Sequence, residues 1–512
     1  RTRTIAIMLR IHVILMTFIG LLALPLGQAE ARVIISEFLA VNEKGLKDAD
    51  DDRSDWIEVH NAGGKTVDLA GWSLTDDIKN LAGWKLPAVK VEAGGFLLVF
   101  ASGKNRATAG EELHADFKLG AGGEYLGLIK PDGRTVSHHY VMKYPKQRDD
   151  VSYGVPVDWK PDADSATSVI GNTVYFLKPT PGAPNGSVLN GTVAKLAFSQ
   201  PHGLYDEPFD LTISTETPGV TLRYTTDGSV PTIDSGTVLE GGLLKMEKTT
   251  VLRVAGFKPG FKPTKVVTRT YLFPKDIVRQ SPDGLPPNGF PYEWGFNYVD
   301  YGMDQRVVND KRYKDRIFDG LRSLPSYSLV MEMDDLFDEE SGIFANAKND
   351  GREWERSCSL EMISPDGESG FQENCGVRIR GGFSRMSPNA KHAFRFFFRS
   401  EYGPAKLQYP VFGKDAAQEF DNIDLRTFSN YSWSLSDDPR CTFMRDQFNR
   451  DMQFSLGQST ARGHYCHLYI NGHYWGLFNV VERPEASFGA TYFKGKQDDF
   501  DVIKIGRGKG KG

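Results

Sequence analysis

The stretch from Cys375 to Phe398 has the residue types that could bind an anion, and it reads C-G-V-R-I-R-G-G-F-S-R-M-S-P-N-A-K-H-A-F-R-F-F-F. Apolar and charged residues alternate before Gly381-Gly382 and again after Lys391, which predicts two neighbouring antiparallel strands joined by a turn. Glycines let backbone amides approach a ligand, and Arg380, Ser384 and Lys391 lie in or beside this turn. These residues suit a phosphate. A surface hairpin with solvated cations explains the same residues, and the stretch alone does not separate the two.

Two elements after this stretch could help to form a site, and the first is a helix. It is predicted to begin at Asp438, a good N-cap followed by Pro439, and to end near Gly457. Its apolar residues recur at every fourth position and predict one apolar face: Met444, Phe448, Met452 and Leu456. Arg445 and Asp446 lie beside that face, where surface charge is the simplest explanation.

The second element is a hairpin. His467–Ile470 and His473–Val481 are predicted strands on either side of Asn471-Gly472, a pair that favours a tight turn. Glu482 follows the second strand, and Pro484 stops that strand because it has no N–H to donate. Glu482 is therefore expected where the chain leaves the sheet.

The composition indicates a globular protein, and the N-terminal segment predicts that it is exported. The 512 residues suffice for roughly three or four domains, and 40% hydrophobic and 25% charged residues are ordinary values. The net charge of −5 gives no support for nucleic-acid binding. An apolar run from Ile11 to Leu26 and an A-x-A pattern at Ala29–Ala31 predict an export signal over residues 1–31. That run is too short for a membrane anchor and none as long follows, so no transmembrane helix is expected in the mature chain.

All four cysteines lie in the C-terminal third of the chain. An even number in an exported chain predicts two disulfides, with three possible pairings. The local pairings Cys358–Cys375 and Cys441–Cys466 are preferred. Zinc is disfavoured because no C-x-x-C spacing occurs and the nearest histidines are not arranged in pairs.

Residues 32–187 contain short strands at regular intervals, which predict a β-sandwich. The motifs I-I-S-E-F, D-W-I-E-V-H-N, V-D-L-A-G-W-S-L-T-D and a closing P-T-P-G-A-P-N resemble the lamin-tail domain family. The resemblance implies an immunoglobulin-like sandwich for interaction or display. The acidic loop from Asp48 to Asp52 does not match a calcium loop, because Arg53 and Val59 stand where an EF-hand needs Gly and Glu. A solvated loop is therefore preferred.

Residues 194–274 predict a second small all-β domain. The motifs P-H-G-L-Y and L-R-Y-T-T-D-G-S-V-P-T resemble the C-terminal accessory domain of chitobiases and β-hexosaminidases. That domain lacks the catalytic barrel of those enzymes, so the resemblance implies a possible glycan contact and no glycosidase. Asp227 could be imagined as an acid, but a D-G pair in a tight turn has a sufficient structural reason.

Residues 323–505 resemble the kinase family named after spore-coat protein H, the CotH family. The resemblance rests on Lys391 and on four motifs: G-V-R-I-R-G-G-F-S-R, L-R-T-F-S-N, M-R-D-Q-F and H-L-Y-I-N-G-H-Y-W-G-L-F-N-V-V-E-R-P. The order hairpin, helix, hairpin also resembles the small lobe of a protein kinase, so an α+β partial kinase-like domain is expected. The resemblance implies transfer of phosphate from ATP, with Mg²⁺, to Ser or Thr of a protein substrate.

The same resemblance implies roles for four residues. Lys391 is expected to be the cation on the nucleotide phosphates, and Arg380 and Ser384 are expected to line the same turn. Glu482 is expected to contact adenosine. The structural alternative for each is a residue that shapes or solvates the fold.

The family's catalytic residues are not found in the chain. A catalytic Asp with a metal-binding Asn, and a second metal-binding Asp, are expected after Pro484, but neither pattern occurs there. Asp498, Asp499 and Asp501 are better explained by a solvated loop. No residue is therefore assigned as catalytic or metal-binding, and the chain as given is expected to be inactive.

The expected organisation is a multidomain exported protein of the periplasm, cell surface or medium. Its expected parts are a signal (1–31), a lamin-tail-like sandwich (32–187), a linker (188–193), a chitobiase-like domain (194–274), a linker packed on a neighbour (275–322), an incomplete CotH-like domain (323–505) and a low-complexity end (506–512). The leading function is that of a CotH-type kinase fragment. The alternatives are a non-catalytic binding protein that contacts surface or matrix components and, on the chitobiase-like domain alone, a carbohydrate-active enzyme.

Overall fold

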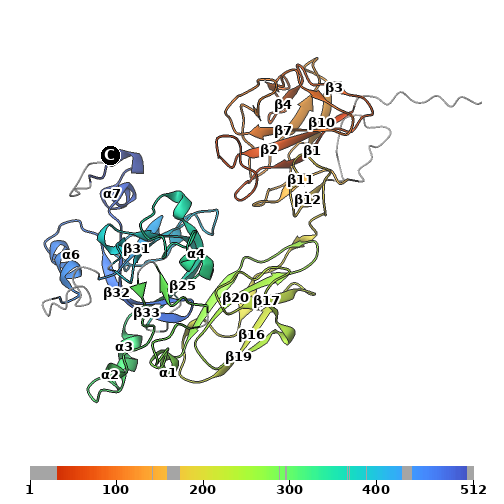
Figure 1. Ribbon diagram of the computed structural model, residues 1–512. Coiled ribbons are helices and arrows are strands. Elements are labelled where there is room, and N and C mark those ends of the chain that lie inside the picture. The colour runs from red at the N-terminus through yellow and green to blue at the C-terminus, as the bar shows by residue number, and fades with distance from the viewer. Residues whose placement is uncertain are drawn as a thin grey trace, which may run out of the picture. The chain divides into compact units, whose positions relative to one another are not determined.

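The computed structural model describes residues 32–140, 142–157, 173–287, 289–294, 297–365, 367, 370–387, 389–428 and 441–503. The expected export signal, the low-complexity end and the expected helix start at Asp438 lie outside the described residues. The chain divides into two compact units. One consists of the residues up to Asn42 with Leu46–Gly186, and the other consists of Ser187–Gly512 with Glu43–Gly45 (Figure 1).

The first unit is the expected immunoglobulin-like β-sandwich. A six-stranded sheet has the order β12-β11-β1-β2-β7-β8, a four-stranded sheet has the order β10-β9-β4-β5, and β3 pairs with β6. The strands are β1 (Val33–Leu39), β2 (Asp55–Asn61), β3 (Val67–Asp68), β4 (Ser73–Thr75), β5 (Trp84–Lys85), β6 (Lys90–Val91), β7 (Phe96–Ala101), β8 (Leu113–His114), β9 (Leu126–Ile129), β10 (Val136–Tyr140), β11 (Ser152–Gly154) and β12 (Val174–Phe176). Apolar side chains from both large sheets, such as Ile57, Leu74 and Leu126, form one core between them.

Two fully buried carboxylates hold the closing segment of this unit. Glu37 accepts hydrogen bonds from the N–H and the hydroxyl of Thr180 at 3.0 and 2.9 Å, and Glu58 accepts one from the N–H of Gly182 at 2.6 Å. Asn185 donates to two main-chain oxygens of the sheet. The acidic residues of I-I-S-E-F and D-W-I-E-V-H-N thus bind the P-T-P-G-A-P-N segment, which explains why these motifs occur together.

The second unit begins with a small all-β domain. Its sheets have the orders β14-β16-β19 and β15-β22-β20-β17-β18, and β13 pairs with β21. The strands are β13 (Gly191–Thr192), β14 (Leu196–Phe198), β15 (Gly203–Leu204), β16 (Phe209–Thr215), β17 (Thr221–Thr225), β18 (Thr237–Val238), β19 (Leu243–Met246), β20 (Thr250–Phe257), β21 (Phe261–Lys262) and β22 (Val267–Leu272), with a 3-10 helix η1 (Glu240–Gly242). Leu211, Val254 and Tyr271 are central in its core.

A seven-stranded closed barrel follows, in the order β25-β26-β27-β28-β31-β33-β32. Its strands are β25 (Ser326–Val330), β26 (Arg356–Ile363), β27 (Phe371–Arg380), β28 (Ala393–Phe397), β31 (Asn422–Arg426), β32 (Gly463–Ile470) and β33 (His473–Val481). Around it lie α4 (Met333–Phe337), η2 (Arg352–Trp354), η3 (Phe383–Arg385), the pair β29 (Leu407–Gln408) and β30 (Glu419–Phe420), α6 (Arg445–Ser455), α7 (Ala486–Phe493) and η4 (Gln497–Asp499). The barrel closes because β25 pairs in parallel with β32, from Ser326 opposite His467 to Leu329 opposite Ile470.

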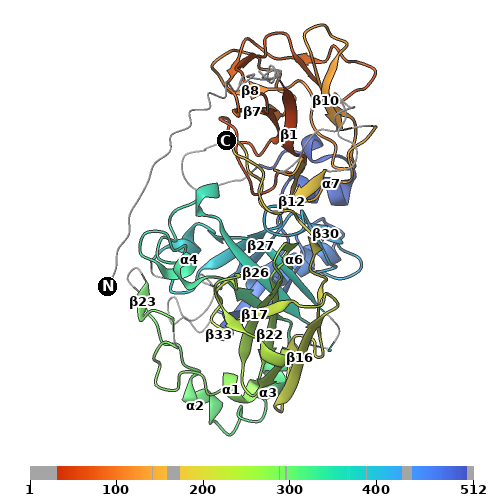
Figure 2. The same cartoon turned by 90° about the vertical axis from the view of Figure 1, so that its right-hand side faces the viewer.

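The small β domain is joined to the barrel by buried contacts. β22 lies against β26 and β27 (Figure 2). The fully buried Glu361 of β26 accepts hydrogen bonds from the N–H and hydroxyl of Thr270 and contacts His202 Nδ1 at 2.7 Å. Apolar residues from both sides share one cluster that includes Leu272 and Ile363. The domain is therefore a fixed part of this unit.

The connecting residues 275–322 also pack onto the barrel, as expected. They form α1 (Pro274–Ile277), β23 (Glu293–Trp294), β24 (Asn297–Tyr298), α2 (Gln305–Val308) and α3 (Ile317–Ser323). Trp294 and Tyr301 are buried in the core of the barrel, where Trp294 packs against Trp475 and Phe344.

Both predicted hairpins are confirmed. β27 and β28 pair antiparallel from Gly376 opposite Phe397 to Arg380 opposite Ala393, and β32 and β33 pair across the turn at Asn471-Gly472. Asn471 and Gly472 have φ values of 45° and 82°, which suit a turn whose two central residues are both left-handed. The sequence did not predict that these hairpins belong to one closed barrel.

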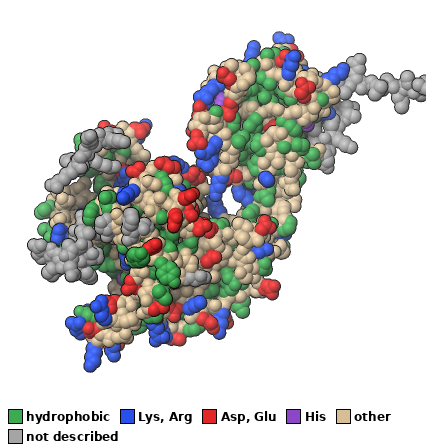
Figure 3. Space-filling model, viewed as in Figure 1, with side chains coloured by type: hydrophobic (Ala, Val, Ile, Leu, Met, Phe, Trp, Pro, Cys, Tyr) green, Lys and Arg blue, Asp and Glu red, His purple; other side chains and the backbone are tan. Residues whose placement is uncertain are grey.

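The predicted helix is present as α6, but its apolar face points outward. Met444, Phe448, Met452 and Leu456 are 59%, 61%, 46% and 71% exposed, and the residue buried against the barrel is Gln447. Figure 3 shows hydrophobic side chains on the surface at the left edge of the view, where α6 lies in Figure 1. The usual rule that an apolar face packs on the core therefore fails for α6, because polar contacts attach it to the barrel: Gln447 Oε1 accepts from Asn479 Nδ2 at 3.2 Å.

The four cysteines are free thiols in the structure. Cys358 lies opposite Cys375 on β26 and β27, whereas neither Cys441 nor Cys466 contacts another cysteine among the described residues. The preferred pairing of Cys441 with Cys466 thus has no support in the structure. No described helix combines the length and the apolar character that crossing a membrane requires.

Candidate functional site

A cavity of about 910 Å³ lies on the outer face of the barrel. Its walls come from the ends of β27, β28, β31 and β33, from α6 and from the residues after β33. In β27 the side chains alternate, so that Val377 and Ile379 enter the barrel core while Arg378 and Arg380 stay on the outer face. The period-two pattern of the sequence thus decides which residues reach the cavity.

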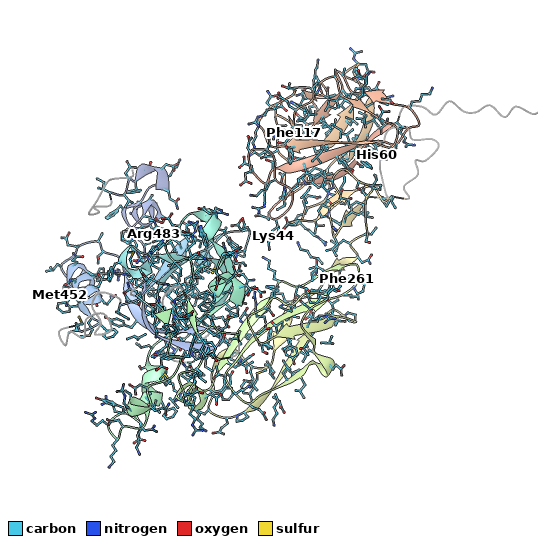
Figure 4. The ribbon with its side chains drawn as sticks, viewed as in Figure 1. Lys44, His60, Phe117, Phe261, Met452 and Arg483 are labelled. Atoms are coloured by element: carbon cyan, nitrogen blue, oxygen red, sulfur yellow. The ribbon has the colours of Figure 1, made fainter. Side chains whose placement is uncertain are left out.

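Five arginines from five different segments line this cavity. They are Arg380 of β27, Arg395 of β28, Arg426 of β31, Arg450 of α6 and Arg483 after β33. Figure 4 labels Arg483 in this part of the chain and Met452 on the side of α6 that faces away from the barrel. Three carboxylates line the same cavity, so arginine is in excess.

Two of the carboxylates each lie between two arginines. Asp424 contacts Arg380 Nε at 3.1 Å and Arg395 Nε at 2.6 Å. Asp446 Oδ2 pairs with Arg426 Nη1 and, at 2.5 Å, with Arg450 Nη2. Each Arg–Asp–Arg group has one more cation than anion, which leaves charge available to an anionic ligand.

The excess of positive charge affects the pKa of Arg380. Burial lowers the pKa of its guanidinium, Asp424 opposes that change, and Arg395, Arg426 and Arg483 lower the pKa further by repulsion. Its Nε makes no hydrogen bond within the described part of the chain, although an oxygen of Asp424 is 3.1 Å away. An anion entering the cavity would both relieve the repulsion and satisfy this donor.

Glu482, the third carboxylate, is occupied by protein groups. One oxygen accepts the N–H of Arg462 at 2.7 Å and the other accepts the hydroxyl of Tyr492 on α7. Burial raises the pKa of this carboxyl. Glu482 therefore joins the end of the barrel to α7, and a direct contact with adenosine remains a proposal.

The other two residues expected at the site do not line the cavity. Ser384 Oγ donates to the main-chain oxygen of Arg380 at 3.0 Å and shapes the turn after β27. A Cβ at Gly381, whose φ is +99°, would lie 2.1 Å from Ser384 Oγ, so this turn requires glycine.

Lys391 reaches the opposite end of β33. More than a third of its surface is exposed, yet its ammonium donates to the main-chain oxygen of Trp475, and the protein around it lowers the pKa to about 8 by desolvation. Among the described residues it forms no ion pair. The structure thus brings Arg380 and Glu482 to one cavity and leaves Ser384 and Lys391 beside it.

The sequence reasoning missed most of the cation cluster. Arg395, Arg426, Arg450 and Arg483 were not proposed as site residues, and Asp446 was attributed to surface charge. The available signal was the alternation of arginine with apolar residues, with Arg395 between two phenylalanines in F-R-F and Arg426 directly after Leu425 in D-L-R. That signal places an arginine on the outer face of a strand without showing that several such arginines converge.

The described residues provide one group of three possible metal ligands, and it is far from this cavity in sequence: Asp48, Asp50 and Asp52. Lys104 Nζ fills the space between them, at 2.6, 2.7 and 2.9 Å. Burial raises the pKa of Asp48, but hydrogen bonds from Lys104 and Ser54 outweigh it and lower that pKa to about 2. The ammonium of Lys104 thus occupies the position between the three carboxylates that a metal ion would take.

The residues that line the cavity suit a small anionic molecule better than a metal ion alone. Its volume lies within the range of small-molecule sites, and beside the arginines it has an apolar part formed by Phe488, Val502 and Ile503. Asp424 and Asp446 are the carboxylates available to a Mg²⁺ ion there, and both are paired with arginine. Magnesium usually enters such sites with the phosphates it binds.

Three family models match separate segments of the chain. Residues 27–143 match the Lamin Tail Domain, residues 200–268 match the Chitobiase/beta-hexosaminidase C-terminal domain, and residues 377–511 match the CotH kinase protein. No curated protein matches the chain significantly. The three expected resemblances and their order are confirmed, and all five arginines of the cavity lie in the CotH segment.

Proposed function

We propose that the C-terminal part of this chain binds ATP as a CotH-type kinase-like domain of an exported protein. The observation that carries the proposal is the convergence of five arginines from five segments in one cavity of the CotH-matching region. Phosphoryl transfer is catalysed mainly by positioning the phosphates and neutralising their charge, and these side chains supply both.

The residues suggest how the nucleotide lies. Arg380, Arg395 and Arg426 bind the phosphates, because their strands present them on one face of the barrel. The base lies toward Phe488, where the wall is apolar. In the kinase family that this segment matches, the nucleotide bound with Mg²⁺ supplies the phosphoryl group that a Ser or Thr hydroxyl of a protein substrate accepts. Because no residue of this chain is assigned as the catalytic Asp, ATP binding without phosphoryl transfer is expected of the chain as given.

Nucleotide binding by the full chain tests the proposal. Titration calorimetry with ATP and Mg²⁺ is expected to show saturable binding that Arg380→Ala and Arg426→Ala each weaken by about 10- to 100-fold, since a charge-assisted hydrogen bond contributes about 1.5–3 kcal/mol. Arg312→Ala is the matched control, because Arg312 is an exposed arginine paired with Asp310 outside the cavity.

Lys391→Met separates the two candidate cations. It is expected to weaken ATP binding less than Arg380→Ala, since its ammonium is held by Trp475 and does not line the cavity. Absence of ATP binding by the wild-type chain, or equal affinity in Arg380→Ala, would contradict the proposal. Binding without transfer of labelled phosphate to any protein would indicate a non-catalytic nucleotide-binding domain.

A further inference from the structure

Cys358 and Cys375 face each other across the first two long strands of the barrel. They are direct partners in the antiparallel register of β26 and β27, between Ser357 opposite Gly376 and Ser359 opposite Asn374. Their sulfurs are 3.6 Å apart. Both side chains are almost fully buried, at 1% and 0% exposure, in the apolar core of the barrel.

This arrangement meets the geometric needs of a disulfide. Directly opposite residues of an antiparallel pair have Cα atoms about 4.5–5.5 Å apart, which lies within the range that a disulfide spans. Moving the sulfurs from 3.6 Å to bonding distance requires small side-chain rotations and no change of strand register. Cys466 also enters the barrel core, yet among the described residues it has no cysteine beside it.

We propose that Cys358 and Cys375 form a cross-strand disulfide when the chain folds in an oxidising compartment, and that Cys441 and Cys466 remain thiols. Each thiol gives up one proton, and the pair gives up two electrons to the disulfide of an exchange catalyst, which becomes a dithiol. One S–S bond forms in the protein as the catalyst's S–S bond breaks.

The burial of the pair sets when the bond forms. Thiol–disulfide exchange requires a thiolate and access, whereas desolvation and the neighbouring Cys358 raise the pKa of Cys375 well above its ordinary value. The bond therefore forms while β26 and β27 pair and before the barrel closes. Once formed, it resists reductants in the native protein.

The bond also has a consequence for the arginine cavity. Cys375 lies five residues before Arg380 on the same strand, so the disulfide ties the strand that carries Arg380 to its neighbour. It closes a loop between residues 17 apart in the sequence, which removes conformational freedom from the unfolded chain. The barrel is expected to gain thermal stability in the oxidised protein.

Peptide mapping of the full chain tests the proposal. The chain is directed to a bacterial periplasm, purified, and alkylated in denaturant with and without prior reduction. Without reduction we expect one crosslinked peptide pair containing Cys358 and Cys375, with Cys441 and Cys466 alkylated. Precursor taken from the cytosol of the same cells should have all four cysteines alkylated.

Three results bear on the proposal beyond the crosslink itself. Dithiothreitol should leave the bond intact unless denaturant is added, and the Cys358→Ala/Cys375→Ala variant should melt about 5 °C or more below the oxidised wild type. Cys441→Ala should leave both the crosslink and the melting temperature unchanged. Four free thiols in the periplasmic protein, or a crosslink to Cys441 or Cys466, would overturn the proposal whether or not the variants fold.

Discussion

At the scale of single residues, the structure separates side chains that look equivalent in the sequence. Arg380 and Lys391 flank the same glycine-bearing turn, but Arg380 lines a cavity with four other arginines while Lys391 donates to a main-chain oxygen. The two side chains differ in their contacts. Arg380 contacts Asp424 and borders the cavity, whereas Lys391 donates to the main-chain carbonyl of Trp475.

Lys391 should leave a signature in the pH dependence of stability. Its pKa is lowered to about 8 in the folded protein from an ordinary value near 10.5, so the folded state binds fewer protons than the unfolded state between these pH values. The wild type should therefore gain stability relative to Lys391→Met as pH rises from 8 to 10. Denaturant unfolding of both proteins at these pH values measures the gain, and parallel curves would show that the ammonium is fully solvated.

At the scale of elements, polar contacts rather than apolar faces fix the positions of two segments. The closing segment of the lamin-tail unit is held by Glu37 and Glu58, and α6 is held by Gln447 and Asp446. Glu37, Glu58 and Gln447 are buried polar residues, and buried polar groups need hydrogen-bond partners, so these bonds fix the position of each element.

The raised pKa of Glu58 predicts that the free energy of unfolding of the first unit falls as pH rises. Burial raises its pKa from 4.5 to about 7, so its contribution to stability is fully present below pH 4.5 and is lost as pH rises through 7. The shift corresponds to about 3 kcal/mol. Glu58→Gln should flatten the dependence of the first unit's melting temperature between pH 4.5 and 7 in calorimetry of the full chain. An unchanged slope would mean that the carboxyl titrates normally.

Because the apolar face of α6 points outward, an apolar residue on it should matter less for stability than the buried Gln447. Phe448→Gln should change the free energy of unfolding by no more than about 0.5 kcal/mol, because this side chain is 61% exposed. Gln447→Ala should lower it by about 1 kcal/mol, because the buried Asn479 loses one of its two acceptors. Urea unfolding measures both, and a larger loss for Phe448→Gln than for Gln447→Ala would show that the apolar face is covered.

At the scale of the whole molecule, the chain has two units, although three family models match it. The chitobiase-type domain shares a buried cluster and buried hydrogen bonds with the barrel, so these two domains stabilise each other. The lamin-tail unit has its own core. Two cooperative unfolding transitions are therefore expected for the full chain, and the second should include the chitobiase-type domain.

Glu361 should control the second transition alone. Glu361→Ala removes the acceptor of Thr270 and the partner of His202 in a fully buried joint, and should destabilise the second unit by about 3 kcal/mol. The exposed Glu216→Ala is the matched control in the same small domain. Calorimetry should show a lower second transition and an unchanged first one. Separate melting of the small domain and the barrel would contradict the shared joint.

The sequence by itself determined the local structure and the three segments of the chain. The Asn471-Gly472 turn, the glycine turn after Arg380, the alternation within β27 and β28 and the family motifs all depend on residues close together in the chain. Short-range sterics and period-two burial are enough to predict them.

Only the tertiary structure decided how these parts meet. The barrel closes through Ser326 and His467, which are far apart in the sequence. The pairing of β28 with β31, a strand from a later part of the chain, brings Arg426 to the face that carries Arg380 and Arg395. The tertiary structure also turned the apolar face of α6 outward. Such pairings depend on the packing of distant segments, which no local preference specifies. The sequence pattern at Arg380 thus predicts an arginine on the outer face of a strand, and a cavity forms there only when β31, β33 and α6 assemble beside it.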